Sequence, residues 1–258
     1  MNFDNFYKNG FQVINADNLS KMEEIRKDIC KCIRDLIDEK VEDDEFLINN
    51  LHDFKKFKNL SDGEFNEKRS LLIGQVNNGF QITESIYKAF KTSINFLLGP
   101  DILGQKFANI TIQKPLDNYP TCAHRDSPPN SHYEIVIWAP MTDAYSTKSM
   151  SVVPKEQSKL LANSISESKS MVEFTKNASD ICYTPKVDFG QALLFHPSLF
   201  HLSHTNEEKE TRLSLNIRFK NLYSPFGLKD PGLFFSPIEI SAVTKLAYEF
   251  EILENKND

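Results

Sequence analysis

The sequence has few of the features that mark secreted, membrane or nucleic-acid-binding proteins. Among its 258 residues are four cysteines, Cys30, Cys32, Cys122 and Cys182, without a Cys-x-x-Cys pair, which predicts reduced thiols in a cytoplasmic protein. No apolar run approaches the ~20 residues of a membrane helix, and the N-terminus is too polar for a signal peptide. The formal net charge is −6 with both signs interspersed, so neither a nucleic-acid-binding face nor a membrane anchor is predicted.

The composition can nevertheless fill a sizeable core, because 40% of the residues are hydrophobic and 20 of them are Phe. We expect a single domain over residues 1–258. Within it, residues 1–103 are predicted to form a mostly helical cover, residues 104–222 a jelly-roll core and residues 223–258 a C-terminal extension.

Helical periodicity dominates the first hundred residues. A short strand is predicted before Ile14, and apolar residues then recur at helical spacing from Ser20 to Glu39. Ser20 and Glu23 have the spacing of a capping box. A second amphipathic helix is predicted from Gly79 to Leu98, whereas residues 41–68 are charged and ambiguous.

Short β-type runs separated by Pro, Asn, Asp and Ser follow from Gly104 onward. The absence of a βαβ rhythm favours a mainly β fold with flanking helices. The expected form is a double-stranded β-helix (jelly roll, cupin-like) with the N-terminal helices packed on its outer sheet. A helical tail over Pro237–Leu253 is expected to complete that cover.

Three of the six histidines lie between Phe195 and Phe219. The alternation there predicts two strands, LLFHPSLFHLS and TRLSLNIRF, joined by a polar turn. The second strand has an apolar core face and a polar face that either lines a polar site or forms a solvent-facing edge. The polar face carries Arg212, Ser214, Asn216 and Arg218.

His124-x-Asp126 carries the clearest chemical signal. Two residues apart at a strand end, an imidazole and a carboxylate point the same way and can take adjacent corners of one metal ion. A later histidine would complete the facial triad of non-heme Fe(II) oxygenases, which leaves three coordination positions open. Of the candidates, His201 is favoured over His196 and His204 because it can share a cavity with the Arg212 face.

Over nearly the whole chain, these motifs resemble the Fe(II)/2-oxoglutarate dioxygenases of the phytanoyl-CoA dioxygenase type. The family usually places an arginine eleven residues after its distal histidine, and Arg212 stands at that offset from His201. The remaining matches are His124-x-Asp126, Trp138-Ala-Pro, Ser149-Met-Ser-Val-Val-Pro154 and His201-x-Ser203-x-x-Asn206.

The resemblance implies an enzyme that binds Fe(II) through His124, Asp126 and His201 and uses 2-oxoglutarate and dioxygen. Arg212, with Ser214 beside it, would hold the distal carboxylate of 2-oxoglutarate, because a guanidinium fork pairs a carboxylate with two charge-assisted hydrogen bonds. Two further positions, Ser203 and Trp138, match residues that contact the cosubstrate in relatives. Three polar residues alternate with isoleucines in the preceding strand: Asn109, Thr111 and Gln113. Each of them either lines the same cavity or has a structural role.

The expected reaction is hydroxylation of a polar small molecule, such as a sugar or another tailoring substrate, with release of succinate and CO2. Lys148-Ser149 and Lys155–Ser158 depart from the family pattern in loops expected at the cavity mouth, which leaves the substrate open. The alternatives are a cupin-like metal-dependent isomerase or hydrolase and a non-catalytic jelly-roll binding protein.

Arg218 lies six residues beyond Arg212, roughly 20 Å along a strand, and cannot share the same carboxylate. An ion pair with Glu or Asp at the barrel rim, or a contact with an anionic part of the substrate, is expected.

Overall fold

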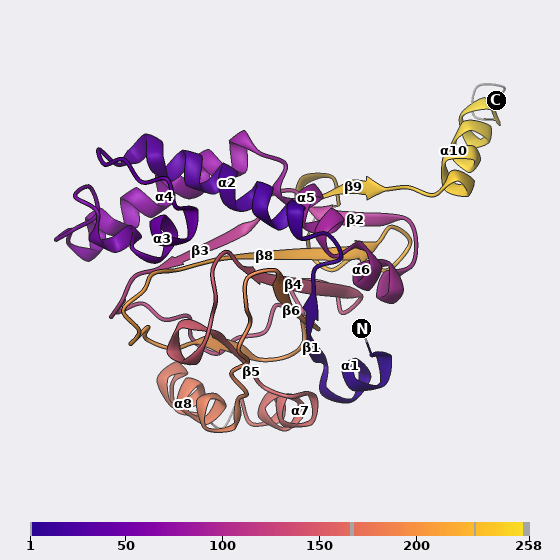
Figure 1. The fold of residues 1–258 in the computed structure, drawn as a ribbon. Helices are drawn as coiled ribbons and strands as arrows, with labels where there is room; N and C mark the ends of the chain where they lie inside the picture. Colours follow the sequence, from indigo (N-terminus) through magenta and orange to yellow (C-terminus); the bar gives the residue numbers. More distant parts are fainter. Residues whose placement is uncertain (1, 166–167, 230, 255–258) are drawn as a thin grey trace.

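The computed structural model describes residues 2–165, 168–229 and 231–254 (Figure 1). A seven-stranded antiparallel sheet, which we call the large sheet, has the strand order β1-β6-β4-β8-β2-β9, with β3 also pairing with β8. A second sheet, the small sheet, pairs β5 with β7. The strands are β1 (Phe11–Asn15), β2 (Ile102–Gln105), β3 (Asn109–Gln113), β4 (Glu134–Pro140), β5 (Met150–Val152), β6 (Gln191–Phe195), β7 (His201–Ser203), β8 (Arg212–Asn221) and β9 (Phe235–Glu239).

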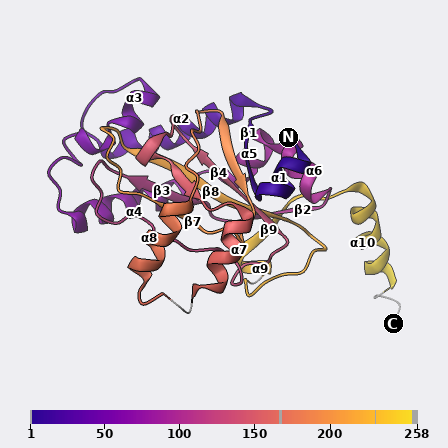
Figure 2. The same cartoon turned by 90° about the horizontal axis from the view of Figure 1, so that it is seen from below.

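Helices lie on both sides of this pair of sheets (Figures 1 and 2). The N-terminal helices from α2 to α5 cover one face of the large sheet, and α7 and α8 lie beyond the small sheet. None of the helices in the described part of the chain combines the length and apolar composition needed to cross a membrane. The helices are α1 (Phe3–Asn9), α2 (Leu19–Leu36), α3 (Asp44–Asn49), α4 (Asp62–Gly79), α5 (Ile82–Ala89), α6 (Lys91–Leu98), α7 (Lys155–Asn163), α8 (Met171–Ile181), α9 (Pro231–Phe234) and α10 (Ala242–Glu254), with 3₁₀ turns η1 (Leu51–Asp53) and η2 (Ser146–Lys148).

The apolar residues form three clusters that match these layers. The largest cluster joins Ile25 and Ile29 of α2 to Leu213, Leu215 and Ile217 of β8. The second lies between the two sheets and the third between the small sheet and α7 and α8. These layers confirm the prediction of a β-rich, antiparallel fold covered by the N-terminal helices.

Strand β8 shows the two-faced pattern predicted for it. Leu213, Leu215, Ile217 and Phe219 enter the core under the N-terminal helices, and the polar residues between them lie on the opposite face of the strand. The two strands on either side of the predicted polar turn belong to different sheets, because β7 pairs with β5 in the small sheet whereas β8 pairs with strands of the large sheet. The run LLFHPSLFHLS also splits into β6 and β7, with a turn at Pro197 between them.

The N-terminal helices differ from the prediction in their starts. Ser20 does not cap α2; its hydroxyl donates to the Asn18 side chain at 2.7 Å, and the helix begins at Leu19. A capping box does exist, but at the start of α4, where the Ser61 hydroxyl accepts from the Glu64 N–H and the Glu64 carboxylate accepts from the Ser61 N–H. The ambiguous stretch 41–68 therefore contains α3 and the beginning of α4.

The helix predicted over residues 79–98 is two helices, α5 and α6. Phe90 breaks it with φ −124° and ψ 25°, and its side chain is fully buried. The first turn of α6 then gains a cap from outside, because the Thr92 N–H donates to the Asp17 carboxylate at 2.7 Å.

The C-terminal tail does not complete the helical cover. Its first part is β9, which adds an edge strand to β2, and α10 begins only at Ala242. Figure 2 shows α10 projecting away from the two sheets.

Candidate metal centre

Two chain segments lie antiparallel and bring the predicted metal ligands together. The His124 N–H donates to the His201 carbonyl at 3.1 Å, and the His201 N–H donates to the His124 carbonyl at 2.9 Å. The Asp126 N–H donates to the Pro197 carbonyl at 2.9 Å, which fixes the next turn of the same segment. As a result the imidazole rings of His124 and His201 have centroids 4.2 Å apart.

The potential ligand atoms of His124, Asp126 and His201 all lie within 4.8 Å of one another. Nδ1 of His124 lies 2.9 Å from the Cys122 carbonyl, and Nδ1 of His201 lies 3.2 Å from the Leu199 carbonyl. A carbonyl can only accept, so each ring carries its proton on Nδ1 and directs the Nε2 lone pair toward the shared space. Burial lowers the pKa of His201 to about 4, which keeps this imidazole in the neutral form that binds metals.

The Asp126 carboxylate has one occupied and one free oxygen. Its Oδ1 lies 2.6 Å from Nη2 of Arg218, with both side chains less than a tenth exposed. Its Oδ2 is buried and has no hydrogen-bond partner among the residues that the structure describes. A buried carboxylate oxygen without a donor is costly, and it lies beside two imidazole lone pairs. The three residues therefore fit a metal ion of the kind bound by two histidines and a carboxylate.

Arg212 lies at the other end of the polar face of β8 and is only 3% exposed. Its Nη1 donates to the carbonyls of Lys148 and Ser149 at 3.5 and 3.3 Å, and its Nε has no partner within the described part of the chain. Burial lowers its pKa to about 10. Beside it, Gln113 Oε1 and Ser214 Oγ also have no partner. A buried guanidinium that no carboxylate of the described residues pairs fits a site for an anion.

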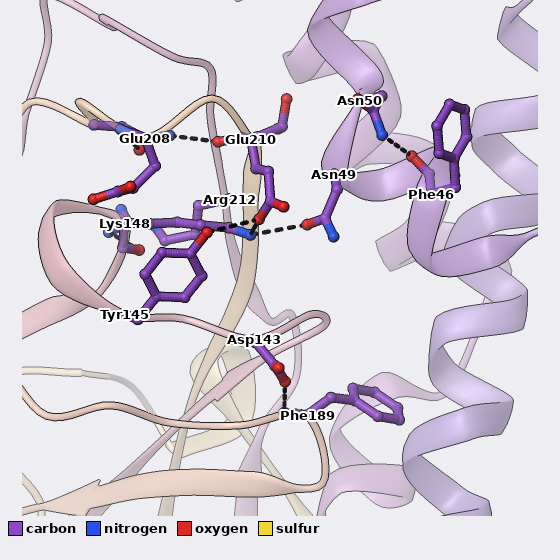
Figure 3. Close-up of polar contacts among 12 residues, drawn as sticks. Phe46, Asn49, Asn50, Asp143, Tyr145, Lys148, Phe189, Glu208, Glu210 and Arg212 are labelled. Atoms are coloured by element: carbon purple, nitrogen blue, oxygen red, sulfur yellow. Dashed lines mark hydrogen bonds and ion pairs between the residues drawn. The ribbon is translucent and has the colours of Figure 1, made fainter.

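Lys148 forms part of the wall next to Arg212, as Figure 3 shows. Its fully buried ammonium lies 2.6 Å from the Glu210 carboxylate and 2.8 Å from the Asn49 side chain of α3. The prediction that Lys148 lies at the cavity mouth is wrong, because the lysine ties α3 to the loop before β8 at the Arg212 end of the site. Residues 155–158 form the first turn of α7.

The polar residues of β3 face the polar side of β8. The register pairs Gln113 with Arg212, Thr111 with Ser214 and Asn109 with Asn216. Gln113 is buried, whereas Asn109 is exposed at the open end of this row.

Two further residues were predicted from the resemblance to contact the cosubstrate, and they lie on β4 and β7. Trp138 is buried opposite Asn216 on β4. The Ser203 hydroxyl accepts from the Thr121 N–H at 2.8 Å and so helps to join the two ligand-bearing segments. Their contact with a cosubstrate stays a prediction.

The other two histidines of the cluster lie outside the triad. His196 uses both ring nitrogens locally, near the His132 carbonyl at 2.9 Å and the Ser198 N–H at 3.2 Å, as expected for a strand-end histidine. His204 contacts the Ser151 hydroxyl at 2.8 Å through Nε2.

Arg218 is the residue whose partner the sequence did not predict. It is buried, with 6% exposure, and its partner is the candidate metal ligand Asp126 instead of an acid at the rim. Its signal in the sequence was the shared face with Arg212, but the sequence did not show that Asp126 lies against that face.

A cavity of about 400 Å³ opens beside His124. Its wall combines polar and apolar side chains, including Arg125, Ser127, Phe174 and Phe200. A larger cavity of about 780 Å³ lies between α1, α7 and the ends of β4 and β6, and none of the three candidate ligands lines it.

The fold is that of non-heme iron and 2-oxoglutarate-dependent oxygenases. A similar solved structure is the non-heme monooxygenase ThoJ in complex with nickel, at TM-score 0.53 and 15% identity, covering 93% of this chain and 84% of that one. HygX from Streptomyces hygroscopicus with nickel and 2-oxoglutarate bound has TM-score 0.52 and 12% identity over 86% and 88% of the two chains. The epimerase SnoN in complex with Fe3+, alpha ketoglutarate and nogalamycin RO has TM-score 0.51 and 14% identity over 88% and 86%. No family model and no curated protein matches the sequence.

Proposed function

We propose that this protein is an Fe(II)- and 2-oxoglutarate-dependent oxygenase of the phytanoyl-CoA dioxygenase type. The observation that carries the proposal is the presence of two features at opposite ends of the polar face of β8. One is the cluster of His124, Asp126 and His201, which adjoins Arg218 at one end, and the other is the buried Arg212, with which no carboxylate of the described residues pairs.

The chain's residues divide the binding work between the two ends of the site. His124 and His201 would hold the metal through Nε2, and Asp126 would hold it through Oδ2. At the other end, Arg212 holds the distal carboxylate of 2-oxoglutarate with its guanidinium fork, and Ser214 adds a hydroxyl. When bound, Fe(II) would supply the oxidising chemistry together with dioxygen and 2-oxoglutarate, and the 2-oxoglutarate would be converted to succinate and CO2.

The substrate in this proposal is a polar small molecule, such as a sugar or another tailoring substrate, and the outcome is its hydroxylation. The cavity beside His124 supports this because its 400 Å³ suits a small molecule and its wall offers Arg125, Ser127 and Ser170 among apolar side chains. We also propose that residues 104–222 form a double-stranded β-helix. In this proposal the chain is one domain, and the enzyme is cytoplasmic.

Arg212 separates this function from its alternatives. The alternatives are a cupin-like isomerase or hydrolase with the same metal ligands and a non-catalytic binding protein. Neither alternative needs a buried guanidinium to bind a carboxylate. Keeping such a group unpaired costs folding free energy, which a cosubstrate carboxylate would offset.

The test is an anaerobic titration of metal-free protein with Fe(II) and then 2-oxoglutarate, followed by a substrate screen that measures succinate. We expect 2-oxoglutarate to bind only after the metal and succinate to rise with the right substrate. Metal binding without 2-oxoglutarate binding would favour the isomerase or hydrolase, and binding of neither would favour the non-catalytic protein.

A further inference from the structure

We propose that Arg218 is a positioning residue that holds Asp126 so that it offers a single oxygen to the metal. The inference rests on the proposed metal site and goes beyond it, because Arg218 itself is neither a ligand nor a partner of 2-oxoglutarate. It starts from the ion pair of 2.6 Å between Arg218 Nη2 and Asp126 Oδ1.

The two carboxylate oxygens of Asp126 have different surroundings because of this pair. Oδ1 is occupied by the guanidinium, and Oδ2 is buried without a partner beside the two imidazoles. A carboxylate pinned at one oxygen cannot turn both oxygens toward the same ion. Arg218 therefore favours monodentate binding through Oδ2, which leaves more of the coordination sphere open to cosubstrate and dioxygen.

Arg218 is itself held in place from the other side. Gln105 on β2 accepts from the Arg218 Nη1 at 3.0 Å and from its backbone N–H at 3.3 Å. The Gln105 amide nitrogen in turn donates to the Phe107 carbonyl at 2.6 Å, and it lies 3.3 Å from the Asn109 side chain. A chain of hydrogen bonds thus connects the candidate metal ligand to β2 and to the edge strand β3.

Arg218 has two opposing effects on a bound cation. Its positive charge repels the metal, while its ion pair fixes the orientation of the Asp126 carboxylate. Outer-shell partners of metal ligands typically contribute 10- to 100-fold to metal affinity, so we expect positioning to exceed repulsion.

The experiment measures the dissociation constant of Mn(II) alone by electron paramagnetic resonance, without 2-oxoglutarate, for wild type and variants at neutral pH. We expect Arg218→Met to weaken Mn(II) binding by roughly 10- to 100-fold and Arg218→Lys to recover part of the loss. Gln105→Met, which leaves the ion pair in place, should give a smaller loss and keeps the idea testable if Arg218→Met does not fold.

Lys220→Met is the matched control. Lys220 is buried two residues further along the same face of β8, and its ammonium donates to the Ser224 and Pro225 carbonyls, so the variant removes one buried cation without touching Asp126. Its Mn(II) affinity should equal that of wild type.

A second readout is the Co(II) absorption spectrum, which should change in Arg218→Met as Asp126 gains the freedom to chelate, and should stay unchanged in Lys220→Met. An affinity in Arg218→Met that equals or exceeds wild type would overturn the positioning role. Failure of the wild-type protein to bind Mn(II) at all would instead overturn the proposed metal site.

Discussion

Replacing Arg212 by methionine tests the proposed cosubstrate site most directly. In the ligand-free protein this guanidinium is 3% exposed, its two contacts are carbonyls at 3.5 and 3.3 Å, and its pKa falls from 12.5 to about 10. That drop corresponds to about 3 kcal/mol of free energy opposing the charged form in the empty site. A carboxylate bound to the fork would recover free energy of this size, and losing one member of such a buried charge pair costs about 2–5 kcal/mol.

The affinity of the Mn(II)-loaded protein for 2-oxoglutarate should therefore fall roughly 30-fold to several-thousand-fold in Arg212→Met, as measured by anaerobic calorimetry. The melting temperature of the ligand-free variant should equal or exceed that of wild type, because a buried unpaired cation has been removed. Arg212→Lys keeps the charge but loses the guanidinium fork, so its affinity for 2-oxoglutarate should lie between those of wild type and Arg212→Met. Arg34→Met, which removes an ion pair to Asp44 near α3, should leave 2-oxoglutarate affinity intact. Wild-type affinity in Arg212→Met would refute the reasoning.

Three further outcomes are expected. Alanine at each of the three candidate ligands should abolish Mn(II) binding while His196→Ala retains it, as measured by metal analysis after dialysis; the reverse result for His196 and His201 would show that the third ligand is misassigned. Burial lowers the pKa of Lys220 from 10.5 to about 8. Between these two pH values the unfolded chain therefore binds more protons than the folded one. The free energy of unfolding in urea should rise with pH across this window in wild type relative to Lys220→Met, and parallel curves would contradict the assignment. Ser61→Ala should cost about 1 kcal/mol of stability in urea unfolding and Ser20→Ala close to none, since only Ser61 caps a helix; equal costs would contradict this difference.

The sequence predicted those features of the fold that depend on the alternation of apolar and polar residues within a single strand. β8 alternates between the helix-covered core and a polar face, and that alternation is visible in Arg212, Ser214 and Arg218 without knowledge of any partner strand. The closeness of His124 and Asp126 was also predictable, because the His-x-Asp spacing fixes two side chains on one side of a strand, whereas His201 was favoured as their partner through the face that carries Arg212.

What the sequence could not supply depends on contacts between distant segments. Ser20 and Ser61 both have a glutamate three residues later, and only the three-dimensional surroundings decide that Ser61 forms the box. The break at Phe90 follows from burying its ring, and the partner of Arg218 comes from a segment almost a hundred residues away.

The arrangement of site residues along β8 has a consequence for how this protein can change over evolution. The residues that would hold the cosubstrate and position a metal ligand lie on one strand at a strict two-residue period, and the residues between them fill the core. One inserted or deleted residue within β8 would exchange the two sets, burying charges under α2 while turning leucines into the cavity. Length changes should therefore be excluded from β8 in any functional descendant, and new specificity should arise by substitution around the cavity beside His124, for example at Phe174 and Phe200.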